Sequence, residues 1–139
     1  MWYPAEVNIF DKAFVDVEAK INTIAADFNE FDAIKRLEQI GKKVQPIAPT
    51  ISHHEIFWLA TLPKFRGKGI GSRLLKPILD DADAQKIGCH LVSSNPGNTS
   101  FYENLGFQQY SLISIDFELT LIVMWRDSYL SNFTPITSN

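Results

Sequence analysis

Residues 66–71 read RGKGIG, a basic, glycine-rich turn between an apolar run and a helical pattern. The apolar run, residues 56–62, is rich in aromatic and aliphatic side chains, is closed by Pro63 and is typical of a buried strand. After the turn, apolar residues recur at helical spacing from Ile70 to about Ala84. A strand, a tight glycine turn and a helix start together present free backbone N–H groups at the positive end of a helix dipole. Such a point binds phosphate.

The spacing of the glycines separates this turn from two other phosphate-binding motifs. A Walker motif needs Ser or Thr directly after Gly-Lys, whereas Lys68 is followed by Gly69. A dinucleotide fingerprint needs Gly-x-Gly-x-x-Gly, whereas the glycines here stand at every second residue. Arg66 and Lys68 add positive charge, and the glycines let a ligand approach the backbone closely. The turn therefore predicts a ligand that carries phosphate.

A second motif occupies residues 95–107, which read NPGNTSFYENLGF. It predicts a turn and then a short helix, which Asn98 could cap and which Gly106 would end. Further strands are expected at residues 89–93, 107–115 and 117–126.

Together the two motifs resemble those of the GCN5-related N-acetyltransferases (the GNAT superfamily), which bind acetyl-coenzyme A. The family carries Arg-x-x-Gly-x-Gly after a strand, then an asparagine, a tyrosine seven residues later and a Gly-Phe pair; the later positions are here Asn95, Tyr102, Gly106 and Phe107. The resemblance covers residues from about 53 to 126. It implies an α/β fold with a central mixed, mostly antiparallel sheet flanked by helices.

The resemblance also implies where the cofactor lies. Pantetheine would run along residues 59–62, bonded by backbone groups of Leu59 and Thr61, and the pyrophosphate would rest on the amides of residues 66–72. Asn95 and Asn98 would position the cofactor, although both also suit an ordinary turn. The predicted cofactor-binding residues are Leu59, Thr61, Arg66, Gly67, Lys68, Gly69, Ile70, Gly71, Ser72, Asn95, Asn98 and Tyr102.

Direct acetyl transfer needs a base for the amine and an acid for the departing thiolate. Tyr102 is the candidate acid, because a phenol with a pKa of about 10 keeps its proton at neutral pH. Glu55 occupies a position where several family members carry Glu or His, and strand alternation puts His53 on the same face and His54 on the other. Partial desolvation is expected to raise the pKa of Glu55. Either Glu55 or His53 could act as the base, or both could be polar residues at the entrance of a strand; Tyr102 could equally be an aromatic residue packed on the sheet.

The whole chain, residues 1–139, is expected to form a single acetyltransferase-like domain, with a mainly helical segment at 1–50 and the acetyl-CoA-binding core at 53–126. Apolar residues three and four apart between Phe14 and Ile40 predict one long helix or two shorter ones, broken near residues 29–32, with Gly41 as a stop. These helices could pack on the sheet or pair as a coiled coil. We expect the domain to lack the usual first strands, and the sheet edge left unpaired would favour a homodimer.

Composition excludes several other classes of protein. The 139 residues, of which 45% are apolar, can bury the core of one compact domain. A net charge of −3 argues against a nucleic-acid partner, and no apolar run is long enough for a membrane span. The single cysteine, Cys89, cannot form an internal disulfide and is expected to be a small core residue. A reducing, cytoplasmic setting is therefore expected, with no metal cofactor.

The sequence thus favours an acetyl-CoA-dependent N-acetyltransferase that acts on a primary amine of a small molecule or peptide. A second interpretation is a CoA-binding remnant that serves as a dimeric interaction module without useful turnover. A third, another phosphate-ligand protein that uses the glycine turn alone, leaves the Tyr102 segment unexplained. The sequence carries no signature of the acceptor amine.

Overall fold

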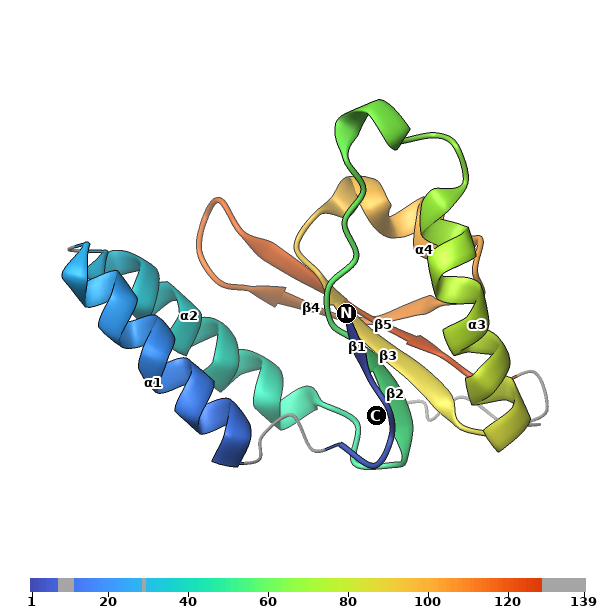
Figure 1. Cartoon of the computed structure of the whole chain (residues 1–139), viewed down its shortest axis with the longest axis horizontal. Coiled ribbons are helices and arrows are strands. Elements are labelled where there is room, and N and C mark those ends of the chain that lie inside the picture. The colour runs from blue at the N-terminus through green and yellow to red at the C-terminus, as the bar shows by residue number, and fades with distance from the viewer. Residues whose placement is uncertain (8–11, 29, 129–139) are drawn as a thin grey trace.

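The computed structural model describes residues 1–7, 12–28 and 30–128. These residues form a five-stranded sheet with helices around it (Figure 1). The strands are β1 (Trp2–Tyr3), β2 (His53–Ile56), β3 (Gly88–Ser93), β4 (Gln108–Ser114) and β5 (Thr120–Arg126). The helices are α1 (Lys12–Asp27), α2 (Phe31–Val44), α3 (Ile70–Gln85) and α4 (Thr99–Glu103), with short 3₁₀ turns at Gln45–Ile47, Pro63–Phe65 and Pro96–Asn98.

The sheet is mixed, with the strand order β1-β2-β3-β5-β4. Strands β2 and β3 are parallel, and the other neighbouring pairs are antiparallel. The parallel pair is joined by α3, because parallel strands need a crossover connection rather than a hairpin. This arrangement confirms the predicted α/β fold with a mixed, mostly antiparallel sheet flanked by helices.

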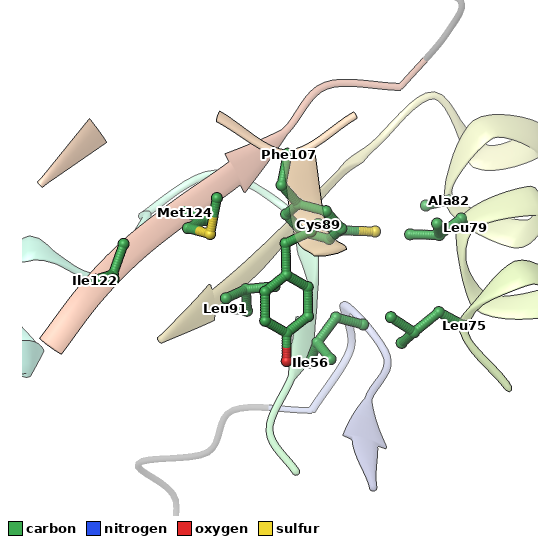
Figure 2. Packing of buried hydrophobic residues seen from close by; sticks show 10 residues of the cluster. Ile56, Leu75, Leu79, Ala82, Cys89, Leu91, Phe107, Ile122 and Met124 are labelled. Atoms are coloured by element: carbon green, nitrogen blue, oxygen red, sulfur yellow. The ribbon is translucent and has the colours of Figure 1, made fainter. Parts of the chain in front are cut away.

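The hydrophobic core lies between α3 and one face of the sheet. Figure 2 shows Leu75, Leu79 and Ala82 of α3 opposite Ile56 and Cys89 of the parallel strands. Each of these side chains is almost completely buried. Because successive residues of a strand point to opposite faces, Cys89 and Leu91 enter this core while His90 between them points away from it.

Helices α1 and α2 form a pair beside the β4–β5 hairpin (Figure 1). Polar contacts join α2 to the hairpin: Arg36 forms an ion pair with Asp116 at 2.9 Å, and Lys43 donates to the Ser114 carbonyl at 2.6 Å. The predicted break between two helices near residues 29–32 is confirmed. The predicted stop at Gly41 is wrong, because the chain stays helical to Val44.

Apolar side chains remain exposed on this helix pair. Phe28 is 75% exposed and Phe31 is 53% exposed, at the turn between the two helices, and Ile24 and Leu37 are also exposed. The predicted homodimer would have apolar surface to bury here, and it stays a prediction.

The expected beginning of the strand before the glycine turn, at His53, is confirmed, but its predicted continuation over residues 56–62 is wrong. β2 covers His53–Ile56, and its pairing with β3 ends at the Ile56–Leu91 pair. Beyond this point the amides of Phe57 and Trp58 donate to the Met1 carbonyl. The aromatic residues that suggested a buried strand are largely exposed, Trp58 by 69%. The local sequence pattern was therefore that of a strand, but the sheet offers residues 57–62 no partner on the β3 side.

Strand β1 pairs with β2 in antiparallel register, with Trp2 opposite Ile56 and Tyr3 opposite Glu55. Among the described residues before residue 50, Trp2–Tyr3 is the one strand. No helix within the described ranges has both the length and the apolar character needed to cross a membrane.

The contact between Gly88 and Trp125 supplies a test of the fold. A Cβ atom at Gly88 would overlap the indole ring of Trp125, so we expect Gly88→Ala to displace this ring and to lower the free energy of unfolding by about 1–3 kcal/mol. A Cβ atom at Gly41, inside α2, meets no other atom within 4 Å. Gly41→Ala is the matched control and should stabilise the protein by about 0.5–1 kcal/mol. Chemical denaturation measures both; equal effects of the two variants would contradict this packing.

Candidate functional site

The glycine turn forms the start of α3. Gly67 and Gly69 have φ values of +72° and +69°, which residues with a Cβ atom rarely adopt, and Gly69 is the residue that caps the helix. The first helical bond runs from the Arg73 amide to the Gly69 carbonyl at 3.1 Å. The amides of residues 70–72 therefore have no acceptor within the helix, and they lie at the positive end of its dipole.

Cationic side chains surround this turn. Lys64, Arg66 and Lys68 are exposed, and the two lysines place their ammonium groups 5.0 and 5.6 Å from the centre of the Phe65 ring. A Cβ atom built on Gly67 or Gly69 meets no atom within 4 Å, so the space above the turn is open. The turn combines free amides, positive charge and room, which are the properties of an anion-binding site.

Gly71 links the turn to the second motif. A Cβ atom on Gly71 would lie 3.0 Å from Cζ of Phe101 and 3.8 Å from Cδ2 of Leu59. Phe101 precedes Tyr102 on α4, and the two rings lie 5.0 Å apart. The tertiary structure thus brings together the glycine turn, the segment after β2 and the helix that carries Tyr102.

The turn before α4 is built differently from the prediction. Asn95, not Asn98, provides the cap: its Oδ1 accepts a hydrogen bond from the Gly97 amide at 2.9 Å. The side chain of Asn98 makes no capping bond, because a 3₁₀ turn precedes α4 and Asn98 is already in helical conformation. Gly106 has a φ of +89° and follows the helix, but as the second residue after the Asn104 cap and not as the first, which the prediction implied.

Tyr102 is buried, with 8% of its surface exposed, and belongs to the hydrophobic core together with Ile56, Leu91 and Phe107. Burial raises the pKa of Tyr102 above its ordinary value. Its phenol therefore keeps its proton at neutral pH, as an acid catalyst requires.

An open backbone edge lies where β2 and β3 separate. Pairing between the two strands stops at the Ile56–Leu91 pair, yet β3 continues to Ser93, which pairs with β5 on its other side. Leu59 and Thr61, the residues predicted to bond pantetheine, lie on the segment that diverges here and are half-buried. Because β2 ends at Ile56, these two residues do not continue the strand face that carries Glu55.

A hollow adjoins this segment at Trp58 and Leu59. It has a volume of about 660 Å³ and is lined by apolar residues that include Trp2, Trp58, Leu59 and Ile78. Leu59 is the one predicted site residue among the residues that line this hollow.

Three polar residues meet on the face of the sheet opposite α3. Glu55 accepts a hydrogen bond from Nδ1 of His90 at 2.6 Å, and the same oxygen lies 3.4 Å from Nε2 of His53. His90 is the register partner of Glu55 on the neighbouring strand. His53 and Glu55 share a face, as predicted. His90 was not among the residues predicted from the sequence. The signal that could have identified it is an ionisable residue in the middle of an apolar strand.

The charges in this cluster influence one another. Burial alone would raise the pKa of Glu55, but hydrogen bonds from His53 and His90 and their positive charge lower it below its ordinary value. The predicted rise of the Glu55 pKa is therefore wrong. Burial alone would lower the pKa of His53, but its bonds to Glu55 and to the Ile51 carbonyl, with the Glu55 charge, raise it. His53 is thus the better proton acceptor and Glu55 its anionic partner.

His54 points the other way, as predicted. It is fully buried, and its Nε2 lies 2.8 Å from Oδ2 of Asp81 on α3. This histidine belongs to the packing of α3 on the sheet and stands apart from the cluster around Glu55.

The link between Glu55 and His53 can be tested directly. Replacing Glu55 by Gln removes the negative charge that raises the pKa of His53, so the pKa of His53 should fall toward or below its ordinary value. Proton NMR of the His53 ring across a pH titration, with a chelator present, measures this change. His54 contacts Asp81 and not Glu55, so its ring signals at a fixed pH should be the same in both proteins. An unchanged pKa of His53 would contradict the geometry.

Several solved structures resemble this chain. A histone acetyltransferase HPA2 and related acetyltransferase from Corynebacterium glutamicum matches with a TM-score of 0.51 and 23% identity, covering 61% of this chain and 46% of that one. Naa50 of Arabidopsis thaliana, solved with the bisubstrate analogue CoA-Ac-MVNAL, matches with a TM-score of 0.49 and 27% identity, covering 54% of each chain. Ard1 from Thermoplasma volcanium matches with a TM-score of 0.48 and 22% identity, covering 55% of each chain. The chain therefore spans about half the length of these structures, and the first of them shows a shared fold.

A family model provides the assignment. The model described as "Acetyltransferase (GNAT) domain" matches residues 32–109, from α2 to the beginning of β4, and so contains both motifs up to the Gly-Phe pair. This match covers more than half of the 139 residues. The protein belongs to the GNAT acetyltransferase family.

Proposed function

We propose that this protein is an N-acetyltransferase that transfers the acetyl group of acetyl-CoA to a primary amine of a small molecule or peptide by direct attack. Beyond family membership, one observation carries the proposal: Gly71 packs against Phe101, next to Tyr102. An anion-binding helix start and a protonated phenol are thereby held in one region, as a reaction on a phosphate-bearing thioester requires.

The residues of the glycine turn would hold the cofactor. The amides of residues 70–72 have no helical acceptor and suit the pyrophosphate, while Arg66 and Lys68 supply positive charge. Leu59 and Thr61 line the open edge beyond β2, where an extended pantetheine arm can bond to unpaired backbone groups. Asn95 and Asn98 stand at the turn before α4, with Asn98 free of a capping role. Acetyl-CoA would supply the acetyl thioester, and these residues would hold it in position.

The chemistry divides between the two faces of the sheet. Tyr102 lies on the core face with Leu91, whereas Glu55 and His90 lie on the opposite face. The two groups would act on one substrate at the edge where β2 and β3 separate, because Glu55 precedes the last residue pair of that ladder and Leu91 of the same pair packs in the core with Tyr102. On this basis the amine approaches from the face of Glu55, and the thiolate leaves toward Tyr102.

His53 is the proposed base. Its Nδ1–H donates to the Ile51 carbonyl at 2.7 Å, so its Nε2 is the nitrogen that can accept a proton, and this nitrogen faces Glu55. Glu55 stabilises the imidazolium that forms, and His90 holds the carboxylate in place. Each group in this chain of contacts is within 3.4 Å of the next.

Cofactor binding is the first test. Acetyl-CoA at a hundred times its dissociation constant should stabilise the protein by about 2.7 kcal/mol, which appears as a rise in Tm. Gly69→Ala introduces a side chain at a φ of +69°, which strains the turn by about 1 kcal/mol. A turn that relaxes this strain no longer orients its amides toward the cofactor, so the stabilisation by acetyl-CoA should be smaller. Gly41→Ala, far from the turn in α2, should respond to acetyl-CoA like the unmodified protein. Absence of any acetyl-CoA response in the unmodified chain would contradict the proposal.

Catalysis is tested by substitutions that keep the packing. Tyr102→Phe removes only the hydroxyl group of a buried side chain and should lower kcat by about 10²–10⁴-fold, a far larger effect than any on acetyl-CoA binding. His53→Gln should lower kcat by a similar factor. The control is Tyr110→Phe, which removes a hydroxyl that bonds the Ile47 carbonyl and should have little effect. The assay follows release of free thiol with a panel of primary amines and N-terminal peptides; cofactor binding without thiol release from any acceptor would favour the non-catalytic binding module instead.

A further inference from the structure

We propose that His53, Glu55 and His90 also form a binding site for a divalent transition-metal ion, with Zn²⁺ as the best match. The ligand atoms of these three residues all lie within 4.8 Å of one another. Among the described residues they form the one group of three potential metal ligands that converge in this way. From the sequence we expected no metal cofactor, and His90 was not among the candidate site residues.

The donor set selects the class of metal. Two imidazoles and one carboxylate suit Zn²⁺ and its neighbours in the first transition row, whereas Mg²⁺ and Ca²⁺ prefer oxygen ligands alone. The thiol of Cys89 is not part of the set, although it adjoins His90 in sequence, because Cys89 points into the core on the opposite face. The site would therefore provide three protein ligands and leave a fourth position open.

The distances require only small side-chain movements. Zinc ligands lie about 2.0–2.1 Å from the metal, which places tetrahedral donors roughly 3.3 Å apart. The separation of His53 Nε2 and Glu55 Oε2 is already 3.4 Å. The His90–Glu55 contact, now a 2.6 Å hydrogen bond, must lengthen by about 0.7 Å, and the widest pair, at most 4.8 Å apart, must close by up to about 1.5 Å.

The surroundings of the histidines favour a metal. Nδ1–H of His53 donates to the Ile51 carbonyl at 2.7 Å, which orients Nε2 toward Glu55 in the way that metal-binding histidines are usually held. Nε2 of His90 is buried and has no hydrogen-bond partner in the described structure, so this ring is not fixed by a second bond. Glu55 and His90 are register partners on adjacent strands, which gives the site a rigid base.

Access to the site is through His53. The side chain of His53 is 18% exposed, compared with 2% for His90. The ring of Trp125 lies 5.8 Å from the ring of His53, and the ring of Tyr110 lies 6.0 Å from the ring of His90. A metal ion can therefore reach the cluster from the His53 side, and its fourth position faces the same opening.

Metal binding has a consequence that rests on the proposed function. The Nε2 atom that accepts the proton of the amine is the atom that would bind the metal. Zn²⁺ would therefore compete with the substrate proton for His53 and inhibit acetyl transfer. The enzyme would then be active without bound metal, and free Zn²⁺ would lower its activity.

The test uses the full chain after removal of metals with a chelator. Titration calorimetry with Zn²⁺ should show one ion per chain, and Co²⁺ should give the visible absorption of a four-coordinate site. His53→Gln and Glu55→Gln should each weaken Zn²⁺ binding by at least about tenfold. Loss of a group that only hydrogen-bonds to a metal ligand already weakens binding by about this factor, and loss of the ligand itself should weaken it at least as much. The matched control is Asp81→Asn, which alters the other histidine–carboxylate pair and should leave the affinity unchanged.

Wild-type affinity in either ligand variant, or no Zn²⁺ binding by the unmodified chain, would overturn the inference. Should a ligand variant fail to fold, NMR of the unmodified chain decides: Zn²⁺ should shift the ring signals of His53 and His90 but not those of His54. The two proposals fail separately. Thiol release in the presence of chelator without any Zn²⁺ binding removes the metal site alone, whereas Zn²⁺ binding without a response to acetyl-CoA removes the proposed enzyme function alone.

Discussion

The parallel pairing of β2 with β3 is the constraint on which the rest of this structure depends. Its register places Glu55 opposite His90, and its end at the Ile56–Leu91 pair leaves a backbone edge open. Both consequences follow from one short ladder of four residue pairs. A shift of the register by one residue would send Glu55 into the core and Ile56 to the other face, because strand side chains alternate.

The hydrophobic core holds the glycine turn and Tyr102 in position. Leu75 and Leu79 of α3 pack in one core cluster with residues of β2 and β3, and their burial fixes α3 relative to the sheet. The glycine turn at that start is then locked by the close approach of Gly71 to Phe101. The free amides at the start of α3 and the Tyr102 phenol are therefore held in place by apolar packing, with no polar contact needed between them.

The cluster around Glu55 illustrates how environment assigns chemical roles. His53 and His54 are neighbours in sequence, yet one is partly exposed beside Glu55 and the other is fully buried against Asp81. The carboxylate of Glu55 serves both His53 and His90, which lowers its own pKa and raises that of His53. The same arrangement of donors that favours proton transfer also matches a transition metal, since a metal and a proton bind the same lone pairs.

The sequence by itself determined the class of the protein: the glycine spacing at residues 66–71, the Tyr102 motif and the helical periodicities have local physical causes, and the structure confirms the fold that they imply. It did not determine where β2 ends, which asparagine caps the turn before α4, or the direction of the Glu55 pKa shift. His90, 35 residues from Glu55, was beyond the reach of local patterns. Only the tertiary structure decided these points, because each depends on which strands and side chains meet across the sheet.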